Sequence, residues 1–458
     1  MEKWLAAALD YIPRWIEFQV RQNEVPGCVI AAAAGGKVVM EQAFGAADLG
    51  TGERLTPRHR FRVASHSKSF TAAGVMKLRE QGRLKLDDRA GQYVEGLHPA
   101  VAEVTLAQLL SHSAGLVRDG ADAGQFSDRR PYLNERELRA ELGEPPAIAA
   151  NTRFKYSNHG FGLVGLVIAA VTGEPYVDWI RREVIAAAGL GETAPDMPMV
   201  AAGTPIAHGH SAKLPLGRRV VIPGDNPTNA IASAGGFVST AADLARFFGQ
   251  LDPAAGQSLL TVASRREMTR RQWRDDGAAG ERYYGLGIMS GRVAECDWFG
   301  HGGAFQGFIS QTIVLPRHGI ALSILTNTIE RFASSWAEGA IHIIAGFARR
   351  GAPKQRLQSW SGRWWNLWYP FDLVAMGDRV IVAAPAQLNP LLDTSEVEID
   401  GADQGRIVLA SGMRNHGEPV RRVRAANGEV AEVWLGGTRL VPEAEIVREI
   451  QETYGKPR

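Results

Sequence analysis

The sequence predicts an α+β fold: an antiparallel sheet with helices between its hairpins, followed by a small antiparallel β-barrel. Two hairpins, one near each end of the first 350 residues, predict the sheet, and spaced apolar positions between them predict helices. After Gly351, short alternating runs separated by Gly, Asn and Asp replace the helical periodicity and predict the barrel. We therefore expect a first domain at residues 1–350, a linker at 351–358 and a barrel domain at 359–458.

The first expected element is an amphipathic helix over residues 4–22, because apolar positions recur there at helical spacing before the break at Pro26-Gly27. The glycine pair Gly35-Gly36 then predicts a tight hairpin turn. The strands of that hairpin are Cys28–Ala34 and Lys37–Phe44.

A second hairpin pairs Ile309–Leu315 with Ile320–Leu325. The sheet therefore takes strands from both ends of the first domain. Further helices are predicted over residues 68–81, 176–188 and 331–349.

The C-terminal region contains eight expected strands at short, regular spacing, as in a small barrel. They are Trp364–Tyr369, Leu373–Met376, Arg379–Ala383, Glu396–Ile399, Arg406–Leu409, Val420–Val423, Val430–Leu435 and Arg439–Val441. The region is rich in tryptophan, at positions 360, 364, 365, 368 and 434. Filling of the barrel core is favoured over a ligand-binding aromatic cage.

The composition limits the classes of partner. The chain has 458 residues, of which 45% are hydrophobic and 22% charged, as in an ordinary soluble protein long enough for two or three domains. A formal net charge of +2 gives no reason to expect nucleic acid or an anionic membrane as partner.

The start of the chain predicts a cytoplasmic protein, because Asp10 and Arg14 interrupt the apolar run that a secretory signal needs. No stretch reaches 18 uninterrupted apolar residues, so no transmembrane helix is expected. Cys28 and Cys296 are interpreted as reduced and structural, without a disulfide framework.

Ser65 and Lys68 stand three positions apart at the start of a predicted helix. Residues at this spacing share one helix face, with Cβ atoms about 5–6 Å apart, so the amine can reach the hydroxyl. A serine hydroxyl is a weak nucleophile until a neighbour takes its proton, and a desolvated lysine can do so. By itself, Ser-x-x-Lys more often means a capping serine and a solvated lysine.

Two further blocks follow in order along the chain: Tyr156-Ser157-Asn158, and His301-Gly302-Gly303. With these, the chain resembles the serine β-lactamase and penicillin-binding-protein superfamily, in the branch of class C β-lactamases, D-aminopeptidases and related esterases. The resemblance covers about residues 20–345. It implies a sheet flanked by helices, a helical subdomain, and a lipocalin-like barrel at the C-terminus.

The resemblance also implies roles. Ser65 is the nucleophile that forms an acyl-enzyme, and either Lys68 or Tyr156 is its base. The two should titrate as a coupled unit, because a phenol needs nearby positive charge to ionise at neutral pH. Asn158, two positions beyond Tyr156 in an extended segment, would hold Lys68 and the substrate. The backbone N–H groups of Ser65 and Ala304 would form the oxyanion hole.

His301, with Gly302 and Gly303, stands where many β-lactamases have Lys-Thr-Gly. Gly303 and its neighbour would let substrate lie close to the strand edge. An ordinary histidine is mostly neutral at pH 7, so His301 would offer no fixed cation to a substrate carboxylate. Carboxylate-bearing β-lactams and D-Ala-D-Ala peptides are therefore expected to be poorer substrates.

The leading hypothesis is a serine hydrolase on small amides or peptides, with D-aminopeptidase-like activity as the best single choice. A carboxylesterase is the alternative, followed by a β-lactamase or DD-peptidase. A non-catalytic scaffold or binding protein ranks last, because every matching position is intact. The expected partner is a small amide, peptide or ester, and homo-oligomerisation is left open.

The remaining histidines indicate no metal site and no cofactor. His208 and His210 form a His-x-His pair without neighbouring acidic residues or cysteines. His112 is interpreted as structural. His66, next to the nucleophile, is expected to point away from Lys68.

Overall fold

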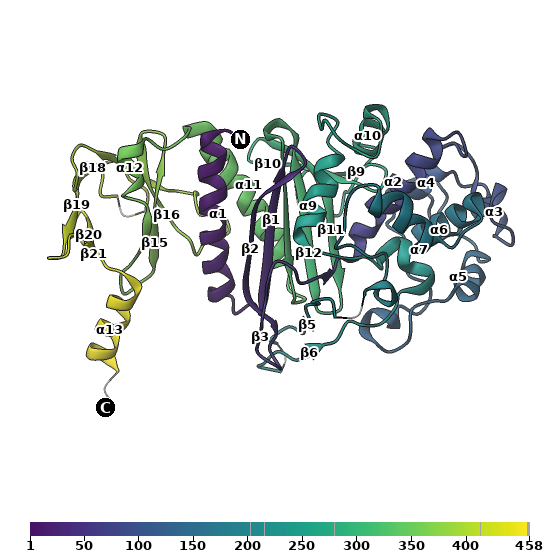
Figure 1. The fold of residues 1–458 in the computed structure, drawn as a ribbon, viewed down its shortest axis with the longest axis horizontal. Helices are drawn as coiled ribbons and strands as arrows, with labels where there is room; N and C mark the ends of the chain where they lie inside the picture. Colours follow the sequence, from purple (N-terminus) through teal and green to yellow (C-terminus); the bar gives the residue numbers. More distant parts are fainter. Residues whose placement is uncertain (202, 215, 279, 413, 456–458) are drawn as a thin grey trace. The chain divides into compact units, whose positions relative to one another are not determined.

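The computed structural model describes residues 1–455 except 202, 215, 279 and 413. They form two compact units (Figure 1), one comprising Met1–Asn23 with Glu338–Arg458 and the other Glu24–Ala337. We call these the smaller and the larger unit. The expected domain boundaries at residues 350 and 359 stay predictions, and the N-terminal helix belongs to the smaller unit with the barrel.

The larger unit is built on a nine-stranded antiparallel sheet. Its strands are β1 (Gly27–Ala34), β2 (Lys37–Asp48), β3 (Glu53–Arg54), β8 (Trp273–Arg274), β9 (Arg282–Tyr284), β10 (Met289–Val293), β11 (Cys296–Phe305), β12 (Phe308–Leu315) and β13 (Ile320–Thr326). Their order across the sheet is β3-β2-β1-β13-β12-β11-β10-β9-β8. Because β1 pairs with both β2 and β13, both predicted hairpins are confirmed and the two ends of the domain meet in the sheet.

Helices cover the sheet and form a helical part beside it (Figure 1). They are α2 (Ser67–Glu80), α3 (Pro99–Ala102), α4 (Leu106–Leu110), α5 (Glu135–Leu142), α6 (Asn158–Thr172), α7 (Tyr176–Ile180), α8 (Ala232–Gly235), α9 (Ala241–Gln250) and α10 (Val262–Thr269). Helix α9 packs on β1, β12 and β13, whereas α2, α6 and α8 pack on one another. The helix predicted over residues 176–188 is α7 followed by a π-helical turn at Arg181–Ala186.

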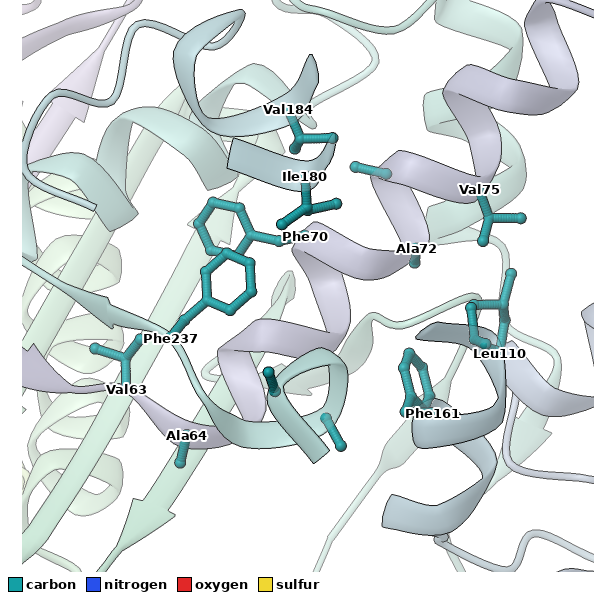
Figure 2. Close-up of a cluster of buried hydrophobic side chains, with 14 of the residues drawn as sticks. Val63, Ala64, Phe70, Ala72, Val75, Leu110, Phe161, Ile180, Val184 and Phe237 are labelled. Carbon is teal, nitrogen blue, oxygen red and sulfur yellow. The ribbon is translucent and has the colours of Figure 1, made fainter. Parts of the chain in front are cut away.

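An aromatic stack fixes α2 in the core of the larger unit. The Phe70 ring lies 4.6 Å from that of Phe237 and 3.8 Å from that of Phe247, measured between ring centroids. Figure 2 shows Phe70 and Phe237 side by side, with Ile180 and Val184 next to them. All five side chains are buried. The start of α2 is therefore held by packing as well as by its own hydrogen bonds.

The smaller unit contains the predicted antiparallel barrel. Its strands are β14 (Gly362–Trp365), β15 (Pro370–Met376), β16 (Arg379–Ala383), β17 (Ser395–Ile399), β18 (Gln404–Leu409), β19 (Pro419–Arg424), β20 (Val430–Leu435) and β21 (Thr438–Leu440). Trp365 and Val441 exchange two backbone hydrogen bonds, of 2.7 and 2.8 Å, which bring the first and last strands together. The barrel is therefore nearly closed.

The predicted N-terminal helix is confirmed as α1 (Lys3–Gln22), and it bonds to the barrel segment within the smaller unit. Tyr11 donates to Asp372 Oδ2 (3.0 Å), and Trp15 donates to the Gln387 carbonyl (3.2 Å). Helix α11 (Phe332–Arg350) matches the helix predicted at 331–349, and α12 spans Gln355–Gln358.

The barrel region differs from the prediction in two respects. Helix α13 (Glu443–Tyr454) was not predicted, because Ile446 alone is buried in it and its apolar pattern is short. Among the tryptophans, Trp360 is buried in the barrel core, but Trp368 is 76% exposed. Core filling is therefore wrong for Trp368, which follows β14 in a loop.

Cys28 and Cys296 are both buried and free. Among the described residues, no single helix is long and apolar enough to cross a membrane, although α6 with Tyr176–Ala186, a pair bent by 82°, meets that requirement jointly.

Candidate active site

Ser65 lies in a tight turn between β4 (Phe61–Arg62) and α2. Ala64 has φ +46°, a left-handed conformation that is strained for a residue with a Cβ. The Ser67 hydroxyl secures the turn, because it donates to the Ala64 carbonyl (2.6 Å) and accepts from the Phe237 N–H (3.0 Å). Local hydrogen bonds and the aromatic core thus hold the strained Ala64 backbone, which positions Ser65.

His66 anchors the other side of this turn. Its Nδ1 lies 3.0 Å from the Val63 carbonyl oxygen and its Nε2 2.9 Å from Thr312 Oγ1 on β12. Burial lowers the pKa of His66 to about 4, so the ring is neutral. The prediction that His66 points away from Lys68 is confirmed.

Lys68 and Tyr156 both reach the Ser65 hydroxyl, as the sequence predicted. Lys68 Nζ lies 3.2 Å from Ser65 Oγ, one helical turn along α2. Tyr156, from the segment before α6, donates its hydroxyl to Ser65 Oγ at 2.8 Å. The structure therefore joins residues 91 positions apart in one hydrogen-bonded chain, Lys68–Ser65–Tyr156.

Lys68 is completely buried, and its amine donates to Asn158 Oδ1 (2.7 Å) and to the Ala234 carbonyl (2.7 Å). Desolvation lowers the pKa of Lys68 well below its usual 10.5, against the opposing charge of Asp119. The neutral amine is therefore favoured, with two N–H groups taken by carbonyl acceptors and one position facing Ser65.

Asn158 is the first residue of α6 and follows the N-cap Ser157, so it does not lie in the extended segment that we predicted. The Asn158 Nδ2 donates to Asp119 Oδ1 at 2.5 Å. This bond turns the oxygen of the Asn158 amide toward Lys68. Sequence analysis missed Asp119, because nothing in its neighbourhood signals a partner 39 positions away.

Burial raises the pKa of Tyr156, and the hydrogen bond to Ser65 and the charge of Arg118 offset this only in part. The phenol is therefore favoured over the phenolate. Of the two bases that the sequence left open, the protonated state of Tyr156 favours Lys68.

Strand β11 passes directly against the turn that carries Ser65. A Cβ at Gly303 would lie 2.1 Å from the Val63 carbonyl oxygen and 2.6 Å from Ser310 Oγ, so only glycine fits there. We predicted that Gly303 makes room for substrate. That stays a prediction. The missing side chain also makes room for the backbone next to Ser65, and Ala304, the next residue, lines the cavity in front of Ser65.

His301 is 1% exposed, and its Nε2 lies 2.9 Å from the Tyr284 hydroxyl. The described residues that line the cavity include Tyr284 but not His301. Desolvation lowers the pKa of His301 well below its usual 6.5. His301 is thus neutral, as expected, but it lies behind the cavity wall and makes no direct contact with its interior.

A cavity of about 880 Å³ opens in front of Ser65, Tyr156 and Asn158. Much of its wall is aromatic or aliphatic: Phe126, Tyr132, Phe154, Ile231, Tyr284, Met289, Phe305, Ile309 and Ile329. The charged residues among its described lining residues are Arg118, Arg282, Arg331 and Asp275. Polar and apolar surface contribute about equally to the wall, so the arrangement suits a substrate that has an apolar part and a polar or anionic group.

The two histidines of the His-x-His pair have protein partners. His208 Nδ1 lies 3.0 Å from Asp48 Oδ2, and His210 Nδ1 lies 2.9 Å from the Asn327 carbonyl oxygen. In the part of the chain that the structure describes, no three His, Cys, Asp or Glu side chains form a metal-binding group.

A family model described as Beta-lactamase matches residues 12–339. Among curated proteins, Protein flp of Staphylococcus aureus strain N315 is 28% identical over 175 residues, which is 37% of this chain and 35% of that protein. The chain thus aligns with about a third of the length of the first curated relatives it matches.

Two solved structures are similar in fold. The octameric penicillin-binding protein homologue from Pyrococcus abyssi has a TM-score of 0.67 at 23% identity, over 94% of this chain and 99% of that one. A D-stereospecific amidohydrolase from Streptomyces sp. has a TM-score of 0.59 at 26% identity, over 71% of this chain and 94% of that one.

Proposed function

The chain belongs to the beta-lactamase family, and from that premise we propose that it is a serine hydrolase that cleaves small amides and peptides through an acyl-enzyme. One observation carries the proposal: the chain Lys68–Ser65–Tyr156, with links of 3.2 and 2.8 Å, at the base of a cavity of about 880 Å³. A nucleophile, a desolvated base and a proton donor are the groups that acyl transfer requires.

In this proposal Lys68 is the base for acylation. Its amine gives two N–H groups to Asn158 Oδ1 and the Ala234 carbonyl, which directs its lone pair at the Ser65 hydroxyl. The Ser65 proton passes to Lys68 as Ser65 Oγ bonds to the substrate carbonyl carbon. The resulting oxyanion is held by the N–H groups of Ser65 and Ala304, and such a donor is worth ~10²–10³ in rate.

Tyr156 then acts as the acid. Its phenol is protonated because burial raises its pKa, and it can give that proton to the leaving nitrogen as the C–N bond breaks. Lys68 keeps the proton that it took from Ser65, and Tyr156 is left as the phenolate. In deacylation Tyr156 takes a proton from the attacking water, and Lys68 returns its proton to Ser65 Oγ. A water molecule releases the acyl group by the same steps in reverse, with Ser65 Oγ as the leaving group.

We propose derivatives of D-amino acids as the substrate, with D-aminopeptidase-like activity as the best single choice. Similarity to a D-stereospecific amidohydrolase at 26% identity supports it. Asp275 is the carboxylate available to an amino group among the described lining residues. The same machinery accepts esters, so a carboxylesterase remains the alternative.

A second candidate is hydrolysis of substrates with a free carboxylate, as in a DD-peptidase or β-lactamase. Arg118, Arg282 and Arg331 line the cavity, so a cation is available even though His301 supplies none. This removes the reason for ranking such substrates low, because a guanidinium can bind a carboxylate in bidentate fashion.

A substrate panel tests both candidates. Wild type and Ser65→Ala would be assayed on D- and L-phenylalanine p-nitroanilide, on p-nitrophenyl butyrate, and on an N-acyl-D-Ala-D-Ala peptide. Preference for the D-anilide, absent in Ser65→Ala, supports the first candidate, and preference for the peptide supports the second. Equal turnover by Ser65→Ala, with an unchanged melting temperature, contradicts the assignment of Ser65.

We also propose that the chain assembles into a homo-oligomer, because an octameric homologue shares its fold over 94% of the chain. Light scattering of the full-length protein tests this, and a monomeric mass across the micromolar range contradicts it.

A further inference from the structure

His112 holds three consecutive residues around Tyr156. It lies two positions beyond α4 and has φ +57°, a left-handed conformation. Its carbonyl accepts the Lys155 N–H at 2.7 Å, and its ring Nδ1 accepts the Ser157 N–H at 3.1 Å. Between these two bonds, the His112 ring lies over the Tyr156 ring, with centroids 4.1 Å apart.

The acceptor role defines the state of the ring. Because Nδ1 accepts a backbone N–H, the ring proton of neutral His112 is on Nε2. Nε2 has no hydrogen-bond partner among the described residues and is enclosed by the rings of Phe154, Phe161 and Tyr284. A proton on Nδ1 would break the bond to Ser157.

The charged surroundings also oppose protonation. His112 is 1% exposed, and Lys68 from α2, His301 from β11 and Arg118 from the loop after His112 face it. Desolvation and then these groups lower the pKa of His112 well below its usual 6.5. The neutral imidazole, with Nδ1 as an acceptor, is therefore favoured.

We propose that His112 is a positioning residue for Tyr156: its Nδ1 fixes the Ser157 backbone and thereby aims the Tyr156 hydroxyl at Ser65. This inference rests on the proposed function and deepens it. A Tyr156 hydroxyl that donates to Ser65 at 2.8 Å must be held to a fraction of an ångström, and displacements of ~1 Å can cost ~100-fold in rate. The sequence analysis interpreted His112 as structural only.

Two substitutions separate the acceptor from the ring. His112→Asn keeps an acceptor near the Nδ1 position and tolerates the left-handed backbone, but it loses the ring. His112→Phe keeps a ring against Tyr156 but leaves the Ser157 N–H without a partner. If His112→Phe does not fold, His112→Ala replaces it, because it also lacks the acceptor.

The test is a double-mutant cycle with Tyr156→Phe, read as the rate of Ser65 labelling by a saturating fluorophosphonate. In the wild-type background, we expect His112→Phe to slow labelling about 10- to 100-fold and His112→Asn to be labelled about tenfold faster than His112→Phe. In the Tyr156→Phe background, we expect His112→Phe to slow labelling by less than a further factor of about two. Melting temperatures are recorded for every variant, and labelling is measured well below the lowest.

Equal losses from His112→Phe in both backgrounds would overturn the proposal, since a merely structural role acts independently of Tyr156. Equal rates for the Asn and Phe variants would also overturn it. Failure of the proposed function gives a different result, in which Ser65→Ala is labelled as fast as wild type, and it overturns both.

Discussion

Gly303→Ala is the substitution whose effect follows most directly from the structure. The new methyl group would lie 2.1 Å from the Val63 carbonyl oxygen, where Cβ atoms do not approach closer than 3.0 Å, so β11 and the Ser65 turn must separate by about 0.9 Å (3.0 − 2.1). The Val63 oxygen cannot yield easily, because it also accepts the His66 N–H at 3.2 Å.

This separation acts on the oxyanion hole. Ser65 lies two residues after Val63, and Ala304 follows Gly303, so the two proposed N–H donors move apart with the two backbones. Loss of one such donor costs ~10²–10³ in rate. Overpacking of this kind also costs ~1–3 kcal/mol of folding free energy. We therefore expect a large loss of activity with a moderate loss of stability.

Gly302→Ala is the matched control. Its methyl group would meet Gln311 Oε1 at 2.7 Å, the end of a flexible side chain that can turn aside. The assay is the rate of fluorophosphonate labelling together with the melting temperature for both variants. Wild-type labelling by Gly303→Ala, or equal losses in the two variants, would refute the argument that Gly303 sets the distance between β11 and Ser65.

Three further predictions concern Lys68, Tyr156 and His301. Lys68→Ala and Tyr156→Phe should each slow acylation by orders of magnitude. The double variant should be little slower than either, since the effects of groups that act as a unit are not additive. Multiplicative losses, measured by stopped-flow acylation, would argue for independent roles. The acylation rate on an uncharged substrate should rise with pH through a midpoint well below 10.5. Desolvation lowers the pKa of Lys68, and only the neutral amine accepts a proton. A midpoint at or above 10.5 would exclude Lys68 as the base. His301→Lys should lower the melting temperature without improving penicillin turnover, because it buries an ammonium beside Tyr284 at a cost of several kcal/mol; a gain in kcat/KM for penicillin at unchanged stability would place residue 301 in the cavity.

The elements of the fold were predictable where the signal is local. Gly35-Gly36 marks the first hairpin, and both glycines have positive φ, of +55° and +77°. The barrel strands follow alternating patterns of a few residues. Helix α13 gives no such signal, because it buries little apolar surface.

The sequence predicts which residues form the site, but not which way their side chains point. The order of motifs predicts that Ser65, Lys68 and Tyr156 meet. It does not determine the register of β11, and a strand's side chains alternate between its two faces, so the burial of His301 could not be deduced. Asp119, which orients Asn158, depends on a loop path that no local pattern encodes.

Unfavourable features are concentrated around the nucleophile. Ala64 and His112 have left-handed backbones, and Lys68 is an amine with 0% exposure. Each would destabilise an isolated segment, at ~1–3 kcal/mol for a strained backbone residue. The surrounding packing offsets them, because Phe70 stacks on Phe247 only two residues after Lys68. The stable core therefore lets the site keep a strained turn and a buried lysine. The same burial that destabilises the charged amine keeps Lys68 in the neutral form, which has a lone pair free to accept the Ser65 proton.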